Sequence, residues 1–209
     1  AFSGCSQNQP MVQKSNGFMM KTDASTHHQQ SIVLGLGCFW GAEKRFAALP
    51  GVIDVVSGYA DGRGLAPDYR VITERQNKFN PDNYAEVIQV TFDPNRISLI
   101  ELYQHFFEIH DPTQQNRQGN HIGTQYRSTI LVSDEQQADV AEKVKQEFQQ
   151  LLTAKGFGPI TTIINPLDKF HPAEDYHQDY LVKNPNGYCP DHSTGVRFNP
   201  ADSPEPTVN

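Results

Sequence analysis

Residues 37–41 read GCFWG and combine one thiol, two aromatic side chains and two glycines. The aromatic surface of Phe39 and Trp40 beside the Cys38 sulfur suits a small, partly apolar substrate group, and the flanking glycines let the backbone turn tightly and a substrate approach. The same residues also fit a buried cysteine in an aromatic core, because free cysteine is among the most buried residue types. The pentapeptide alone leaves both interpretations open.

The elements around this segment put Cys38 at a turn. The apolar run 32–36 predicts a buried strand, and Ala42, Phe46 and Leu49 recur at the spacing of a helix. Unpaired backbone N–H groups and the helix dipole at a helix start favour a negative charge. We therefore expect the pKa of the Cys38 thiol to be lowered, since cysteines in such places titrate between about 3.5 and 7.5 and attack as thiolates.

A carboxyl group in a second segment is the candidate proton donor. Glu86 lies in the expected strand 84–92, on the same face as Ile88 and Val90. On a surface strand this carboxylate would be solvated. In a half-buried position its pKa would rise, and the protonated group would be able to donate a proton.

Three further polar segments are candidates for a site. Residues 110–128 are 19 residues with one aliphatic side chain, and their arginine and tyrosine content favours a binding loop over disorder. Residues 171–178 read HPAEDYHQ and fit a metal site or a capped helix start, and we favour the helix start because the histidine spacing is not that of a metal-binding pair. Cys189, in a turn-rich stretch, is either an inert surface thiol or a thiol that swings towards a second cysteine.

The remaining pattern alternates strands and helices, which predicts an α+β domain of two layers. A chain of 209 residues is long enough for one domain with its own core. We expect strands at 52–59, 84–92, 125–132 and 159–164, and a short helix over 174–182. A capping box at Ser98 and Glu101 should open a helix that carries Leu99, Leu102, Phe106 and Ile109 on one face. Ser133 and Gln136 should cap a long helix whose inward side chains are Val140, Val144, Phe148 and Leu151.

Composition excludes several classes of protein. The net charge is −7 and no basic run appears, so we expect no nucleic-acid partner. No stretch approaches the roughly 20 apolar residues of a membrane-spanning helix, so we expect no transmembrane segment. The three cysteines are far apart in the sequence and form neither a disulfide scaffold nor a C-x-x-C pair.

Together these segments resemble the A-type peptide methionine sulfoxide reductases over about residues 31–189. The shared motifs occur in the order of that family: GCFWG at 37–41, HDPTQ, RQG and GTQYRS within 110–128, AEDYHQ at 173–178, and GYC at 187–189. The resemblance implies a ferredoxin-like α+β two-layer sandwich with long loops. It also implies a catalytic domain over 31–198.

The resemblance assigns a role to each candidate residue. Cys38 would be the nucleophile, and Glu86 would give a proton to the sulfoxide oxygen or hydrogen-bond it. Cys189 would be the resolving cysteine. The residues expected around the substrate are Phe39 and Trp40 against the methyl group, Tyr69 and Tyr126 assisting at the oxygen, and His121.

The implied reaction turns methionine-S-sulfoxide, free or in a protein, into methionine. It leaves a sulfenic acid on Cys38, then a Cys38–Cys189 disulfide that thioredoxin or a similar reductant reduces. No metal or organic cofactor is required. The expected partners are oxidised proteins or free methionine sulfoxide and a thioredoxin-like reductant, and we expect a monomer.

Two positions depart from the pattern of the family. His121 stands where members usually carry aspartate, and a cationic imidazole there would favour the Cys38 thiolate and disfavour a protonated Glu86. Arg197 stands where many bacterial relatives carry a second recycling cysteine. The sequence therefore predicts a catalytic cycle with a single disulfide.

The ends of the chain differ in composition from the centre. We expect residues 1–30 to form a flexible tail and the proline-rich residues 199–209 to be disordered. The sequence AFSGCS at residues 1–6 resembles the end of a bacterial lipoprotein signal, after which Cys5 would carry a lipid. A cytoplasmic location and a periplasmic, membrane-anchored location through Cys5 both stay open.

Two rival functions compete with a reductase. Another thiol enzyme, a peroxidase or a cysteine hydrolase, would use His110, His121 or His177 as its base. A hydrolase would not need Cys189. A non-catalytic sulfoxide-binding protein of the cell envelope is the second rival, and the joint presence of Cys38, Glu86 and Cys189 argues against it.

Overall fold

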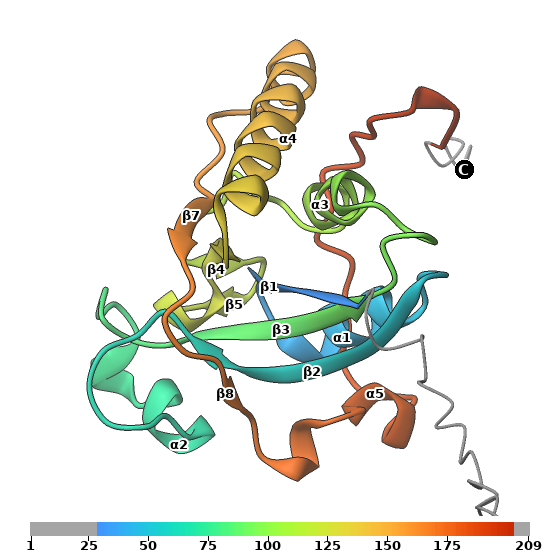
Figure 1. Cartoon of the computed structure of the whole chain (residues 1–209). Helices are drawn as coiled ribbons and strands as arrows, with labels where there is room; N and C mark the ends of the chain where they lie inside the picture. The colour runs from blue at the N-terminus through green and yellow to red at the C-terminus, as the bar shows by residue number, and fades with distance from the viewer. Residues whose placement is uncertain (1–28, 203–209) are drawn as a thin grey trace, which may run out of the picture.

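The computed structural model describes residues 29–202, which fold around a six-stranded sheet (Figure 1). The strands lie in the order β7-β6-β1-β3-β2-β8, and every neighbouring pair is antiparallel except β6 and β7. Their bounds are β1 Gln30–Leu36, β2 Val52–Ala60, β3 Ala85–Phe92, β6 Ser128–Val132, β7 Ile163–Pro166 and β8 His171–Pro172.

Helices connect these strands in the order of a ferredoxin-like sandwich. Helix α1 joins β1 to β2 and helix α3 joins β3 to β6, while the four central strands lie in the order β6-β1-β3-β2. This topology confirms the α+β two-layer prediction. The helices are α1 Phe39–Ala47, α2 Tyr69–Thr73, α3 Leu99–Glu108, α4 Glu135–Ala154 and α5 Tyr180–Lys183, and a small separate sheet pairs β4 Arg117–Gln118 with β5 His121–Ile122.

Strand alternation divides the sheet into two buried faces. Residues such as Leu34, Ile88 and Ile130 point towards α1, α3 and α4 and form the main core with them. Val33, Val87 and the other residues of opposite parity form a smaller cluster under the segment that contains Leu167 and Phe170. Glu86 shares its parity with Ile88, so the sheet carries its carboxyl group to the helix face.

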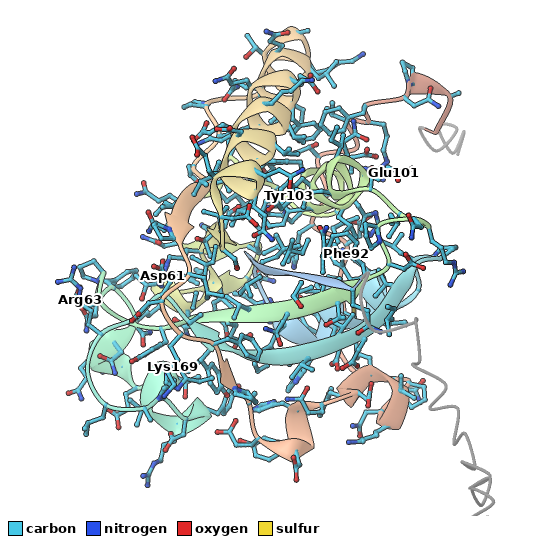
Figure 2. The ribbon with its side chains drawn as sticks, viewed as in Figure 1. Asp61, Arg63, Phe92, Glu101, Tyr103 and Lys169 are labelled. Carbon is cyan, nitrogen blue, oxygen red and sulfur yellow. The ribbon has the colours of Figure 1, made fainter. Side chains whose placement is uncertain are left out.

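Helices α3 and α4 pack side by side and close the core from above in Figure 1. The predicted capping box is confirmed: Ser98 Oγ accepts the Glu101 N–H at 3.1 Å, and a Glu101 oxygen accepts the Ser98 N–H at 2.7 Å. Figure 2 shows Tyr103 between the two helices and Phe92 between the sheet and α3, and both side chains are fully buried.

The start of α4 lies one residue from its predicted place. Asp134 is the N-cap and accepts the Gln137 N–H at 2.8 Å, while Gln137 accepts the Ser133 N–H at 3.0 Å. The predicted cap of Ser133 and Gln136 is therefore wrong, because aspartate competes well with serine for this position. The buried face of α4 is also displaced by one residue at two of the predicted positions: Ala141 and Leu152 are buried, whereas Val140 and Leu151 are only partly buried.

Two predicted strands are shorter than expected. Residues 124–126 form a 3₁₀ turn before β6, and the buried Arg127 guanidinium fixes that turn by donating to the carbonyl oxygens of Thr124, Asn83 and Asp61. In the expected strand 159–164, pairing begins only at Ile163. The preceding backbone donors bond Gln149 and Pro112 instead of a strand.

The predicted helix over 174–182 divides into two parts. A 3₁₀ turn covers Asp175–His177 and α5 begins at Tyr180, because Asp179 takes the left-handed conformation with φ of 53°. The Asp179 N–H donates to Glu43 of α1 at 3.0 Å, which fixes the break. None of the helices between residues 29 and 202 has the length and apolar character needed to cross a bilayer.

Replacing Phe148 with alanine tests the core that holds the helices on the sheet. The Phe148 ring is fully buried and packs on the rings of Phe107 and Phe198 at 5.6 and 5.1 Å. We expect Phe148→Ala to lower the free energy of unfolding by about 3–5 kcal/mol in urea titrations. The control Leu65→Ala, at a side chain that is 92% exposed, should change it by less than about 0.5 kcal/mol. Equal urea midpoints for Phe148→Ala and the parent would refute this packing.

Candidate active site

Cys38 is the N-cap residue of α1, directly after the tight turn that ends β1. Gly37 has φ of +96°, and a Cβ there would lie 2.8 Å from the side chain of Gln118, so only glycine fits this turn without displacing the loop. The half-buried Cys38 side chain therefore lies between the sheet and the start of α1, at the strand-to-helix turn that the sequence predicts.

The pKa of Cys38 moves in the direction opposite to the prediction. Burial and, second, the charge of Glu86 raise it to about 12. The backbone N–H groups of Trp40 and Gly41 act in the expected, lowering direction but are outweighed. In the free site Cys38 is therefore a thiol near neutral pH.

Glu86 lies on β3 directly beneath the first turn of α1. Glu86 is 2% exposed, and its carboxyl group accepts the Phe39 N–H at 3.1 Å. Burial raises the pKa of Glu86 to about 8, against the smaller lowering effect of that hydrogen bond. The carboxyl is thus protonated near neutral pH, and the solvated-surface interpretation of Glu86 is wrong.

The two aromatic residues after Cys38 have different surroundings. Phe39 is fully buried, with its ring 5.7 Å from Tyr59 and 4.9 Å from His177. Trp40 is half-buried and stacks on Tyr180 of α5 at 3.7 Å with an interplanar angle of 11°. Of these two residues, the indole of Trp40 is therefore the one with an accessible aromatic surface.

His177 fixes the indole through a hydrogen bond that sequence reasoning missed. Trp40 Nε1 donates to His177 Nδ1 at 3.0 Å, and burial lowers the pKa of His177, so this nitrogen stays free to accept. Glu174 lies 3.7 Å from His177 Nε2 and also accepts the Tyr59 hydroxyl at 2.7 Å and the Tyr69 N–H at 2.8 Å. The segment 171–178 thus positions the aromatic wall, and among residues 29–202 no group of three or more His, Cys, Asp or Glu side chains is arranged to hold a metal.

Tyr69, His121 and Tyr126 line one side of the site. They share a surface pocket of about 430 Å³. Burial raises the pKa of both tyrosines, with Glu86 as the second cause, so both phenols lie within electrostatic range of that carboxyl. Tyr69 contacts His177 at 4.6 Å and Tyr126 contacts His121 at 5.1 Å between ring centroids. The structure brings these three predicted residues together.

The expected cationic character of His121 is wrong. Burial lowers its pKa, and His192 acts in the same direction, so the imidazole is neutral near neutral pH. His121 is not among the causes that shift the pKa of Cys38 or Glu86. The proposed electrostatic effect on these two groups therefore loses its basis.

Cys189 lies on the other side of Cys38. Both cysteines are free thiols and line a cavity of about 30 Å³, close to the volume of one water molecule. A Cβ built on Gly41 would lie 3.2 Å from Cys189 Sγ, so this sulfur is against the first turn of α1. Arg45, further along α1, donates to the Pro190 carbonyl at 3.3 Å and holds the segment in place.

A larger cavity of about 800 Å³ lies elsewhere and shares no wall residue with the cavity of Cys38 and Cys189 or with the pocket of Tyr69 and Tyr126. Asp61, Arg63 and Lys169 line it and appear together at the left of Figure 2. Its charges are mixed, and the buried Arg127 pairs with Asp61 at 3.2 Å. Neither a cysteine nor a glutamate lines this cavity.

Comparison with known proteins identifies a family for this arrangement. The family model described as peptide methionine sulfoxide reductase matches residues 30–201. A peptide methionine sulfoxide reductase MsrA of Vibrio parahaemolyticus is 47% identical over 175 residues, which are 84% of this chain and 80% of that protein.

Solved structures agree with this match. Methionine sulfoxide reductase A of Corynebacterium diphtheriae superposes with a TM-score of 0.72 at 41% identity, over 83% of this chain and 84% of that one. Mxr1 of Saccharomyces cerevisiae in complex with Trx2 matches at 27% identity with a TM-score of 0.53, over 85% of this chain and 96% of that one.

The burial of Glu86 predicts a measurable dependence of stability on pH. Its pKa is about 8 in the folded protein against about 4.5 in an unfolded chain, so its contribution is full below pH 4.5 and is lost as pH rises through 8. Between pH 6 and 8 we expect the parent to lose about 2 kcal/mol of unfolding free energy relative to Glu86→Gln, which has no proton to release.

Urea titrations of both proteins at the two pH values measure this loss. The control Glu142→Gln removes an exposed carboxyl group from α4 and should shift the unfolding free energy equally at both pH values. A Glu86→Gln difference that does not change with pH would mean that the Glu86 carboxyl is already ionised at pH 6.

Proposed function

The chain belongs to the peptide methionine sulfoxide reductase family, and we propose that Cys38, Glu86 and Cys189 perform the reaction of that family in this protein. The protein is an oxidoreductase that reduces methionine-S-sulfoxide to methionine and is recycled by thioredoxin or a similar reductant. The observation that carries the residue assignment is the buried, protonated Glu86 carboxyl beneath the turn that bears Cys38.

Substrate binding uses the aromatic and phenolic residues around this pair. The methyl group of the sulfoxide packs on Trp40, whose indole is fixed by Tyr180 and His177. The sulfoxide oxygen points towards Glu86, with the hydroxyl groups of Tyr69 and Tyr126 as further hydrogen-bond donors. The ring positions and the shared pocket of the two tyrosines support this placement.

The first chemical step needs a nucleophile and an acid together, because the sulfoxide sulfur is a poor electrophile and its oxygen a poor leaving group. Cys38 sulfur attacks the sulfoxide sulfur while Glu86 protonates the oxygen, and the thiol proton of Cys38 restores the Glu86 carboxyl. The hydroxyl group then passes to the Cys38 sulfur: a Cys38 S–O bond forms as the substrate S–O bond and the new S–S bond break, so that methionine leaves and Cys38 becomes a sulfenic acid.

The raised pKa of Cys38 gives this step an order. In the empty site, burial and the charge of Glu86 disfavour a Cys38 thiolate. When a sulfoxide is bound, its oxygen takes the proton of Glu86, and the transfer of the Cys38 proton to Glu86 becomes favourable. The site therefore holds two neutral, protonated groups until substrate arrives. This keeps the thiol less reactive towards other oxidants between turnovers.

The second step regenerates the enzyme. Cys189 attacks the Cys38 sulfenic acid, water leaves, and a Cys38–Cys189 disulfide forms for reduction by a thioredoxin-like dithiol. The common cavity of the two thiols supports this pairing. Position 197 is an arginine that pairs with Glu108 at 3.5 Å and donates to its carbonyl at 2.6 Å, so this position offers no second recycling thiol.

Two of the three histidines that a rival thiol enzyme could use as its base have no free acceptor nitrogen, whereas the third, His121, lines the cavity that Cys38 shares with Cys189. His110 is fully buried, and its two nitrogens bond the Phe106 carbonyl at 2.6 Å and the Ser128 hydroxyl at 2.8 Å. Burial lowers the pKa of His110 to about 4. The His177 nitrogen Nδ1 is occupied by Trp40, so neither ring is available to a nucleophilic Cys38.

Single-turnover reduction of a dabsyl-methionine sulfoxide by the pre-reduced protein tests the assignment. We expect one methionine per protein from the S epimer and none from the R epimer, followed by the loss of two hydrogens in the intact mass. Cys38→Ser should give no methionine. Cys189→Ser should still give one methionine but no disulfide, because only the second step needs that thiol.

Full methionine formation by Cys38→Ser would remove Cys38 from the nucleophile role. Repeated turnover with thioredoxin by Cys189→Ser would remove Cys189 from the resolving role. Cys5 lies outside the described residues, and a disulfide that includes it would contradict the cycle of one disulfide.

A further inference from the structure

Three histidines line the small cavity that Cys38 and Cys189 share, and two of them, His121 and His192, each have a nitrogen that is unpaired within the described part of the chain, whereas both nitrogens of His110 are hydrogen-bonded. His121 comes from β5, and His192 lies three residues after Cys189. His121 Nδ1 and His192 Nε2 are buried atoms that have no hydrogen-bond partner among residues 29–202. Buried polar nitrogens are nearly always paired, so two unpaired ones beside two thiols point to a partner that appears during the reaction.

The loop and the C-terminal segment are shaped around these two rings. The centroid of the His121 ring lies 5.6 Å from that of Tyr188 and 6.1 Å from that of His192, at interplanar angles of 66° and 87°. A Cβ on Gly119 would lie 2.3 Å from the His192 ring, so the left-handed glycine with φ of +56° makes room for that imidazole. The histidine pair is thus a packed feature of this chain.

The charges around the pair leave His121 as the better proton acceptor. Burial and, second, the charge of Arg45 from α1 lower the pKa of His192, while Asp191 acts in the opposite direction. His121 faces the neutral His192 and the phenols of Tyr126 and Tyr188. Burial lowers the pKa of both rings, so each is neutral and keeps one nitrogen lone pair near neutral pH.

The second chemical step needs a base that the groups already assigned do not supply. Cys189 attacks as a thiolate, so its proton must leave first. The Glu86 carboxyl holds its own proton near neutral pH, and both nitrogens of His110 are hydrogen-bonded. His177 Nδ1 accepts from Trp40, which leaves the proton of the neutral ring on Nε2, a nitrogen without a hydrogen-bond partner among the described residues, so Nε2 cannot accept another proton.

We propose that His121 is the general base and acid of the resolving step, an inference that rests on the proposed function. Its free nitrogen takes the proton of the Cys189 thiol, and the thiolate attacks the Cys38 sulfur. The S–S bond forms as the S–O bond breaks. The imidazolium returns the same proton to the departing hydroxide, so one water leaves and no external oxidant or reductant is used.

Rapid-quench single turnover with dabsyl-methionine S-sulfoxide separates the two steps. Methionine formation reports the first step, and alkylation followed by intact mass reports disulfide formation in the second. We expect His121→Asn to form the disulfide about 100-fold more slowly near neutral pH, and to slow methionine formation at least about tenfold less than disulfide formation, because His121 also lines the substrate pocket.

The pH profile distinguishes a base from a structural residue. In the parent, the rate of disulfide formation should fall only on the acid side of the lowered His121 pKa and be flat above it. In His121→Asn it should rise about tenfold for each pH unit, because the thiolate then forms without help. Added imidazole should restore the second step in His121→Ala, which also keeps the test valid if one variant folds poorly.

His171→Asn is the matched control, because that ring lies on β8 outside the Cys38 cavity and should leave both steps unchanged. Disulfide formation by His121→Asn at the parent rate, equal slowing of both steps, or an unchanged pH profile would each overturn the proposal. Absence of methionine with the parent protein would instead refute the proposed function, which separates the two failures.

Discussion

The hydrogen bond from the Phe39 N–H to the Glu86 carboxyl, 3.1 Å long and fully buried, is the contact on which the site depends. It joins the first turn of α1 to the centre of the sheet and places an acid directly under the nucleophile. Both partners come from the best-packed part of the molecule, where Phe39, Ile88 and Phe106 exclude water. The dry surroundings keep the carboxyl protonated, and the same surroundings raise the pKa of the thiol.

Burial therefore acts on both reacting groups in the same direction, towards their neutral forms. An acid that must donate a proton gains from this, whereas a nucleophile that must lose one does not. The two groups act together: Glu86 gives its proton to the sulfoxide oxygen, and the proton of the Cys38 thiol replaces it on Glu86. The surrounding contacts, from Tyr180 and His177 to Trp40 and from Arg45 to Pro190, hold substrate and second thiol in fixed positions around that exchange.

Local patterns in the sequence predicted the parts of the structure that local physics determines. The strand-to-helix turn at Cys38 follows from an apolar run and helical spacing, the capping box at Ser98 from two residues, and the orientation of Glu86 from strand alternation. The bond from Trp40 to His177 joins residues 137 positions apart, and no pattern within either segment specifies it. The break at Asp179 depends on Glu43 in the same way. The signs of the pKa changes at Cys38 and His121 depend on how deeply each side chain is buried, which a helix start or a residue type does not reveal.

The titration of the Glu86 carboxyl in the reduced, substrate-free protein tests the central claim most directly. Carbon-13 NMR of protein labelled at the glutamate side-chain carboxyl, assigned by comparison with Glu86→Gln, follows this one group across the pH range. The account predicts a midpoint near 8 and a protonated carboxyl at neutral pH. A midpoint near the ordinary value of about 4.5 would contradict it, because an ionised Glu86 could not supply the proton that the sulfoxide oxygen requires.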